Sequence, residues 1–319
     1  MSVFHLGLRR FAIAVTVFAM LGAAGTARAS LKEGQDYIAH GDYKAAEKVL
    51  KRVKGADESK AKLELARLAF LIGQLDSAKS LARALLNARE AEVALEARIL
   101  LAELLRYTGE YAKAVELMSE QHKKNPNHLP SRHALARALE DVGKSADADV
   151  LWNLFFDEFD QGKLDVNNPE HLYMVAEAAN HLESVEDASD QYQDAVSIDK
   201  TLHKANIAVG RLFMRKYSPG DAAGIFDDVL KINPKHPDAL AGIAALKTGE
   251  LWDIAGATST LDKILDMRRY LTLMESNFPS ELGTAFRSME NSSNPWGISQ
   301  TTRADWAKNL DVPIVDGSE

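Results

Sequence analysis

The sequence predicts an all-α protein, a solenoid of stacked helix–turn–helix pairs, and three observations support this fold class. A short motif that begins with glycine and ends with alanine recurs along the chain at intervals of 32 to 40 residues. A small residue stands at one fixed distance before each copy of the motif. The 319 residues include no cysteine, so packed helices must stabilise the fold without disulfides.

The recurring motif is typical of the turn inside a helix pair. Its four clear copies occupy residues 41–46, 73–78, 109–114 and 143–148. The glycine lets the backbone leave the first helix, and the alanine lets the second helix lie close against its neighbour. Weaker copies end at Ala188 and Ala222, where Glu183 and Tyr217 occupy the glycine position, and a degenerate seventh copy ends at Gly256. We expect these later turns to follow the pattern less closely.

Two further positions repeat with the motif. Twelve residues before its last position, in the first helix, the chain has Gly34, Ala66, Ala102, Ala136, Ala176, Gly210 and Ala244. Alanine and glycine make up about one fifth of the chain, so seven small residues in seven places are not expected by chance. Four residues after the motif, bulky residues recur at Leu50, Met118, Trp152, Tyr192 and Phe226, with Ala82 and Thr260 as exceptions. This pattern predicts that the paired helices cross at the small residues.

In this register the repeats resemble the tetratricopeptide repeat (TPR) family, whose unit is a helix–turn–helix of 34 residues. The resemblance covers roughly residues 31–275. It implies a right-handed superhelical solenoid of about six to seven repeats over 30–253, because one helix pair cannot bury its apolar face alone. The polar stretch 161–168 is the longest interruption and predicts a bend near 160–169. An amphipathic helix at 254–275 is expected to cap the stack.

The two ends of the chain differ from the repeats. Residues 1–29 combine a basic start, a short apolar run and an Ala-Arg-Ala ending, which predicts a secretory signal peptide and a periplasmic or secreted protein. An uncleaved N-terminal anchor is the alternative. Residues 276–319 are rich in turn-forming residues and predict a mostly irregular tail. Trp296 and Trp306 in this tail either fold back onto the solenoid or form a partner-binding arm.

Charge and motifs exclude several classes of function. The net charge of −8 becomes −11 without residues 1–29, which hold three arginines and no acid. Such an acidic chain is not expected to bind nucleic acid. The zinc-protease His-Glu-x-x-His, the glycine-rich phosphate loop and the Gly-x-Ser-x-Gly nucleophile motif are absent, and the nine histidines are dispersed. We therefore predict no enzyme activity, no catalytic residue, no cofactor and no metal.

The TPR resemblance implies that the first helix of each pair lines a concave groove. The positions that it places on this groove are Arg67, Phe70, Glu103, Tyr107, His133, Arg137, Tyr173, Glu177, Asn180, Arg211 and Arg215. Arginine and tyrosine are enriched where interfaces concentrate binding energy, so the set predicts a protein- or peptide-binding surface. Its arginines would favour an acidic or C-terminal carboxylate ligand. The alternative is that these are solvated positions. The lysine and asparagine clamp of chaperone-binding members is absent.

Three functional hypotheses follow from these observations. The first is an exported scaffold or adaptor that assembles envelope, secretion or polymer-export machinery through its groove. The second is a structural subunit that docks through its convex face or through the tail with Trp296 and Trp306. An enzymatic or sugar-binding role is the third and is least supported, because polar residues do not converge in the sequence pattern.

Overall fold

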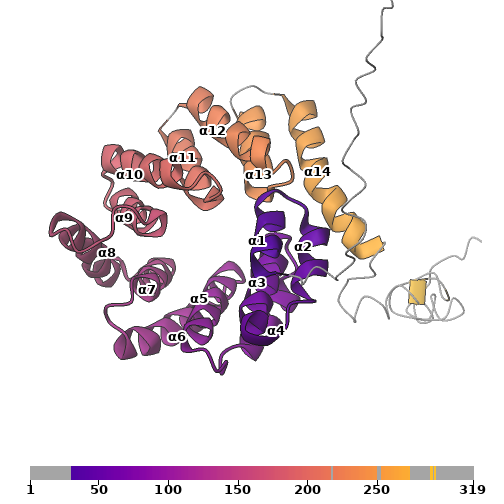
Figure 1. The fold of residues 1–319 in the computed structure, drawn as a ribbon. Coiled ribbons are helices and arrows are strands. Elements are labelled where there is room, and N and C mark those ends of the chain that lie inside the picture. Colours follow the sequence, from indigo (N-terminus) through magenta and orange to yellow (C-terminus); the bar gives the residue numbers. More distant parts are fainter. Residues whose placement is uncertain (1–29, 217, 250–252, 274–287, 290, 292–319) are drawn as a thin grey trace, which may run out of the picture.

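The computed structural model describes residues 30–216, 218–249, 253–273, 288–289 and 291, and the regular structure within these residues is helical (Figure 1). Residues 31–124 form α1 (Leu31–Ala39), α2 (Tyr43–Leu50), α3 (Glu58–Leu71), α4 (Leu75–Ala84), α5 (Ala91–Tyr107) and α6 (Tyr111–Lys124), with a short 3₁₀ helix at Gly55–Asp57. Residues 129–273 form α7 (Leu129–Asp141), α8 (Ser145–Asp160), α9 (Pro169–His181), α10 (Val185–Ile198), α11 (His203–Arg215), α12 (Pro219–Ile232), α13 (Pro237–Gly249) and α14 (Ile254–Leu273).

These helices form a TPR-type solenoid, so the predicted all-α fold class is confirmed. Each odd-numbered helix packs against the even-numbered helix that follows it, and each pair packs against the next. Helices α1, α3, α5, α7 and α9 also contact one another in series, and α11 contacts α13. Figure 1 shows these first helices on the inside of the curve and the second helices outside. The first helices therefore line the concave wall.

The small and bulky positions of the repeat explain how each pair packs. The alanines that end the motif, from Ala46 to Ala222, are completely buried, and Trp152 is 1% exposed. A Cβ atom added to Gly34 would lie 2.3 Å from Leu50 Cδ2, which is too close for any real contact. The small residue of the first helix therefore makes room for the bulky residue of the second.

The turn inside the pair uses one residue in the left-handed region. The glycines at the start of the four clear motifs have φ between +74° and +83°. Glu183 occupies the same place in the turn between α9 and α10, and it adopts φ +62°. The weaker motif thus gives the same turn without glycine. Tyr217, at the corresponding place before α12, lies outside the described residues.

Buried apolar side chains form a continuous core through most of the solenoid. One cluster extends from Leu63 in α3 to Leu212 in α11 and includes Phe155 and Leu172, on either side of the loop 161–168. The core does not divide at the loop where the sequence predicts a bend. Helix α14 packs against α13, at the place where a capping helix is expected.

The solenoid makes contact with its own beginning after one turn. Tyr43 Oη donates hydrogen bonds to Asn233 Oδ1 and to the carbonyl of Lys235, both at 3.3 Å. The side-chain nitrogen of Asn233 donates to the carbonyl of Ile38 at 3.3 Å, and His203 Nε2 lies 2.8 Å from the carbonyl oxygen of Ala39. We call this set the closure contact. Figure 1 shows the result, with α1 and α2 beside α13.

The predicted signal peptide at 1–29 and the predicted tail with Trp296 and Trp306 lie outside the described residues. Within the described part of the chain, none of the helices combines the length and the apolar character that crossing a bilayer requires.

Candidate partner-binding groove

The structure places the residues predicted for the groove on the first helices and divides them into two groups. Arg67 and Phe70 on α3 and Tyr107 at the end of α5 form an N-terminal group. The central group, on α7, α9 and α11, consists of His133, Arg137, Tyr173, Glu177, Asn180 and Arg215. Arg211 belongs to neither group: it extends toward Asp238 on α13, with 2.8 Å between Arg211 Nη2 and Asp238 Oδ1.

The N-terminal group joins an aromatic pair to a charged cluster. The rings of Phe70 and Tyr107 meet edge to face with centroids 5.5 Å apart, and Tyr107 is 66% exposed. Arg67 lies 2.9 Å from Glu64 Oε1 and 2.5 Å from Glu96 Oε2. Burial opposes the charged form of Arg67, but these carboxylates outweigh burial and raise its pKa. This region offers a partner an apolar ring edge beside an arginine that is already paired.

The central group surrounds a partly buried carboxylate. Glu177 on α9 accepts a hydrogen bond from Tyr192 Oη, and its Oε2 lies 3.8 Å from His133 Nε2. Burial alone would raise the pKa of Glu177, but His133, Arg137 and Tyr192 together lower it to about 2. Burial lowers the pKa of His133 and raises that of Tyr173, whose ring centroids are 5.8 Å apart. The carboxylate is therefore ionised and held in place by its neighbours.

A polar cleft of about 270 Å³ opens beside this group. Its lining consists of Arg137, Glu140, Trp152, Glu177, Asn180, His181, Glu183 and Arg215. Glu140 Oε1 accepts a hydrogen bond from Trp152 Nε1 at 2.7 Å and also contacts His181 Nδ1. The other ring nitrogen of His181 lies 2.7 Å from Asp149 Oδ1. These contacts fix the floor of the cleft.

Most of the arginines predicted for the groove are paired with carboxylates of the protein itself. Arg67 and Arg211 have the partners given above, and Arg137 Nη1 lies 3.6 Å from Glu103 Oε1. Arg215 is different, because it donates a hydrogen bond to the neutral Asn180 Oδ1. Among the residues that the structure describes, it has no carboxylate within 4.0 Å. Arg215 is therefore the guanidinium of this wall that is best placed to meet a ligand.

Sequence reasoning missed four residues of the cleft. The repeat pattern predicts Trp152 only as a bulky residue at a helix crossing, where it is indeed buried, but its indole nitrogen also donates to Glu140. Glu140 and His181 lie in the last turns of α7 and α9, three residues after Arg137 and one residue after Asn180. Glu183 carried the one signal that could have revealed it, since it replaces the glycine of the motif.

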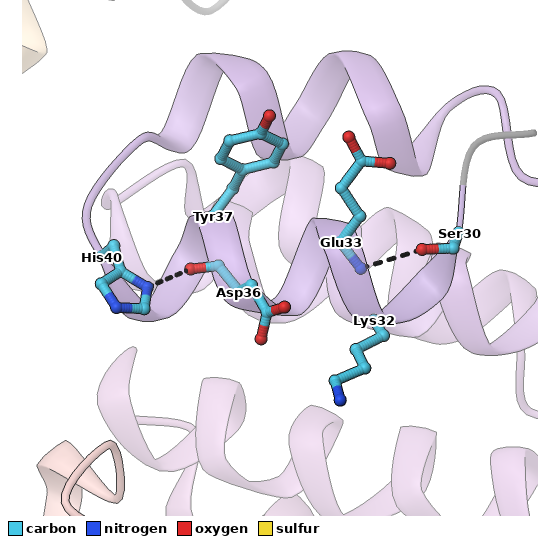
Figure 2. Close-up of a pocket in the computed structure, with 6 residues that line it drawn as sticks. All are labelled: Ser30, Lys32, Glu33, Asp36, Tyr37 and His40. Atoms are coloured by element: carbon cyan, nitrogen blue, oxygen red, sulfur yellow. Dashed lines mark hydrogen bonds between the residues drawn. The ribbon is translucent and has the colours of Figure 1, made fainter. Parts of the chain in front are cut away.

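A second depression of about 400 Å³ lies at the start of the solenoid (Figure 2). Its lining comes from Ser30 and from one face of α1, including Glu33, Tyr37 and His40. The hydrogen bonds drawn there are local, from Glu33 N to Ser30 Oγ and between His40 Nδ1 and the carbonyl of Asp36. Because one helix supplies the whole lining, this depression has no opposing wall and is not the candidate site.

The chemistry that the groove offers is hydrogen bonding and ion pairing. The polar cleft presents guanidinium and amide donors beside carboxylate acceptors, held by the partly buried surroundings. Within the described ranges, no three His, Asp or Glu side chains are arranged to hold a metal ion. The fold and this surface together define the class of protein as a TPR-type solenoid with a polar cleft on its concave wall.

Comparison with known proteins gives similarities of fold and of short segments. No protein-family model matches the chain. The solved structures that resemble it include MamA (19% identity, 53% of this chain and 95% of that one, TM-score 0.36). A TPR protein from Parabacteroides merdae shares 14% identity over 74% of this chain and 91% of its own, with a TM-score of 0.45. YrrB, described as a TPR protein with an unusual peptide-binding site, shares 17% sequence identity over 57% of this chain and 91% of its own, with a TM-score of 0.34. Because these scores are low, the fold assignment rests on the helix pairs of this chain.

Two curated proteins share a segment with the chain. A probable iron–sulfur-binding oxidoreductase, FadF of Bacillus subtilis, is 40% identical over 58 residues, which are 17% of this chain and 8% of that protein. An EtfAB:quinone oxidoreductase of Syntrophomonas wolfei is 29% identical over 86 residues, which are 24% of this chain and 12% of that protein. The chain thus spans about a tenth of these relatives. Since the 319 residues contain no cysteine, they cannot supply the thiolates that hold iron–sulfur clusters.

Proposed function

We propose that this protein is an exported, non-enzymatic scaffold or adaptor that binds a protein or peptide segment in its concave groove. The observation that carries the proposal is the polar cleft on α7, α9 and α11. It combines a floor in which Glu140 and Glu177 already have donors with the half-buried Asn180 and the exposed Arg215. A preorganised wall of this kind binds a ligand without ordering its own side chains first.

The groove suits an extended segment of polypeptide. The first helices of successive repeats line it in series, so the binding surface continues beyond the cleft to the Phe70 and Tyr107 pair. Arg215 can donate to a backbone carbonyl, to an acidic side chain or to a C-terminal carboxylate. We therefore keep the acidic ligand that the sequence predicts as part of the proposal. The remaining arginines would have to exchange an internal carboxylate for that of the ligand.

Export supports a place for this scaffold in the cell envelope. The sequence of residues 1–29 has the three parts of a signal peptide, and the rest of the chain has no cysteine that a disulfide-forming compartment would oxidise. Assembly of envelope, secretion or polymer-export machinery is therefore the role that we propose. Mass spectrometry of the N-terminus in a periplasmic fraction tests export, and a chain that begins at Ser30 is the expected result. A chain that retains residues 1–29 in the membrane fraction would instead support an uncleaved anchor.

The groove itself is tested by capture of partners from the cell envelope. The chain that begins at Ser30 serves as bait, and the retained proteins are identified by mass spectrometry. Arg215→Glu should release the partners that bind in the cleft. Arg83→Glu is the matched control, because it makes the same charge reversal at an exposed position of α4, outside the first helices. Equal capture by both variants would exclude the cleft as the binding surface.

A structural subunit docked through the convex face is the second candidate function. Val150 and Leu154, one turn apart on α8, are 63% and 36% exposed although both are apolar. Helix α8 lies on the outer side of the curve in Figure 1. Replacing both residues with serine, or deleting residues 276–319, should abolish association if the convex face or the tail is the docking surface. Arg215→Glu would then leave association unchanged.

A further inference from the structure

Glu183 holds a backbone conformation that glycine holds in the equivalent turns. With a φ of +62°, Glu183 is the one non-glycine residue with positive φ among the residues that the structure describes. In the first four pairs this place is occupied by Gly41, Gly73, Gly109 and Gly143. A side chain in this region is strained, because its Cβ crowds the neighbouring backbone. Glycine would form the same turn without that strain. The chain therefore has a glutamate side chain at a turn position where the backbone conformation favours glycine.

The position of this carboxylate is specific. Glu183 lines the polar cleft, and no other described residue of the turn position does so. Its side chain is exposed, and within the described ranges it makes no hydrogen bond or ion pair. The other two carboxylates of the lining, Glu140 and Glu177, already accept hydrogen bonds from Trp152 and Tyr192. Glu183 is thus the acceptor of the cleft that remains available to a ligand.

The helix ends around the cleft favour a positive charge. Glu140 is the residue before the last of α7, His181 is the last residue of α9, and Arg215 is the last residue of α11. Three helices therefore direct their C-terminal carbonyl ends toward this region, where the helix dipoles place partial negative charge. The lining holds three carboxylates and two guanidinium groups: Arg137 lies near Glu103, whereas Arg215 bonds to the neutral Asn180 and keeps its charge. The net charge of −8 adds to the same potential.

We propose that Glu183 selects a cationic side chain, lysine or arginine, on the polypeptide segment that binds in the polar cleft. The inference rests on the proposed function and adds the chemistry of the ligand to it. Arg215 and Asn180 hold a carbonyl or carboxylate of the segment, and Glu183 receives the positive charge of a neighbouring residue. The strained turn is kept because this residue determines specificity.

Two substitutions separate the charge of Glu183 from its backbone strain. Glu183→Gln keeps the strained turn and removes the charge, so its melting temperature should equal that of the wild type. Glu183→Gly removes both, so its melting temperature should be unchanged or higher by about 2 °C, because relief of strain opposes the greater entropy of the unfolded chain. The affinity of both variants for a cationic ligand should be lower than that of the wild type, and by the same factor.

The matched control moves glutamate to another turn. Gly109 has φ +80° and open space where a Cβ would stand, and it does not line the cleft. Gly109→Glu should lower the melting temperature by a few degrees, because it adds the strain that Glu183 carries. Its binding of a cationic ligand should equal that of the wild type. An effect of Gly109→Glu on binding would mean that overall charge, rather than the position of Glu183, governs the interaction.

The binding measurement uses the full chain and two defined peptides. The probes are acetyl-Ala-Gly-Lys-Gly-Ala-amide and the same peptide with the lysine Nζ acetylated, which removes the charge. Shifts of the Trp152 indole signal, assigned with Trp152→Phe, report occupation of the cleft in an NMR titration. We expect the lysine peptide to bind about three- to fivefold more weakly to Glu183→Gln than to the wild type. This difference should shrink in 1 M salt, which screens partly exposed charges.

The outcomes distinguish this inference from the proposed function. Equal binding of both peptides to the wild type, or an unchanged affinity in Glu183→Gln, would overturn the role of Glu183 and leave the groove intact. Absence of any shift with either peptide, together with equal capture of envelope partners by Arg215→Glu and wild type, would overturn the groove itself. A lower melting temperature in Glu183→Gly would assign Glu183 to stability and would also overturn the inference.

Discussion

The concave wall contains two regions that the same repeat register builds differently. In the N-terminal region, on α3 and α5, the aromatic pair joins the half-buried Phe70 to Tyr107, which is 66% exposed. In the central region, on α7 and α9, the corresponding wall holds partly buried, hydrogen-bonded carboxylates. The second helices explain the difference. The bulky position behind the central region holds Trp152 and Tyr192, whose polar atoms donate to Glu140 and Glu177.

The N-terminal region lacks such donors. The same two positions behind it are occupied by Ala82 and Met118, both completely buried and both without a hydrogen-bond donor in the side chain. The least exposed carboxylate paired in this region, that of Glu64, is instead held by Arg67 and Gln35 from the first helices. The comparison shows that the repeat determines which positions face the groove. The residue behind each position determines whether a carboxylate there receives a hydrogen bond from the second helix.

The largest effect is expected from removing the indole behind the central region. Trp152→Ala deletes a buried ring and removes the indole that donates to Glu140, so it should destabilise the protein by about 3–5 kcal/mol. Met118→Ala removes the side chain at the corresponding position of the preceding pair and should cost about 2–5 kcal/mol, from packing alone. Trp152→Phe isolates the polar contribution, because it keeps a ring and loses the donor. Thermal unfolding followed by circular dichroism measures all three variants. Equal stability of Trp152→Phe and wild type would show that the indole hydrogen bond contributes nothing.

Acidification should weaken the central region through Glu177. The pKa of this carboxyl is lowered to about 2 in the folded protein, so its contribution is complete above its ordinary value near 4.5 and is lost as the pH falls toward 2. The contribution amounts to up to about 3 kcal/mol. Glu177→Gln should therefore depend less on pH than the wild type between pH 4.5 and 2. Comparison of the two proteins is needed because other carboxyls, including Glu110, titrate in the same window. Parallel pH profiles of the two proteins would contradict the expectation.

A smaller effect should separate the two regions most directly. Tyr192→Phe removes the hydroxyl that donates to the partly buried Glu177, which should cost about 1–3 kcal/mol. Tyr107→Phe makes the same chemical change in the exposed N-terminal region and should stay within about 0.5 kcal/mol of the wild type. The free energy of the first unfolding transition in urea measures both. Similar costs for the two variants would end the distinction drawn between the regions.

The features that the sequence predicted are those that recur locally. Gly34, Ala66 and the other small residues lie buried at helix crossings, because their spacing reports one short-range packing rule repeated along the chain. The partners of the groove arginines could not be predicted in this way, since Glu96 and Asp238 come from other repeats. The left-handed conformation of Glu183 could not be predicted, because glutamate rarely adopts it and the sequence has no glycine at this position to indicate it. The turn was detected only through the alanine that ends the motif.

The closure contact lay beyond sequence reasoning for a different reason. It joins Tyr43 to Asn233, which are 190 residues apart. Whether these residues meet depends on small rotations between successive pairs that add up over a full turn of the solenoid. An error of a few degrees per repeat would separate them. No local pattern in the sequence records that sum.

The smallest effect is expected at the closure contact, where packing between repeats is replaced by a few hydrogen bonds. Tyr43→Phe removes the hydroxyl that contacts Asn233 and Lys235, and it should cost about 0.5–1.5 kcal/mol. Tyr37→Phe on α1 is the control and should stay within about 0.5 kcal/mol of the wild type. If the contact fixes the curvature of the solenoid, small-angle X-ray scattering should show a larger radius of gyration for Tyr43→Phe alone. Identical scattering of both variants would mean that the repeats alone set the curvature.

The pH dependence of this contact sharpens the comparison with the central region. The rings of His203 and His236 meet edge to face with centroids 5.3 Å apart, and burial lowers the pKa of both, that of His236 to about 4. Asp199 and Asp238 favour the protonated rings, whereas His40 and Arg211 oppose them. Because the unfolded chain takes up these protons near pH 6.5, the contribution of the contact is complete above that pH and is lost as the pH falls toward 4. As the pH falls, the closure contact should therefore loosen at a higher pH than the one at which Glu177 becomes neutral. A radius of gyration that stays constant from pH 7 to pH 4 would contradict this order.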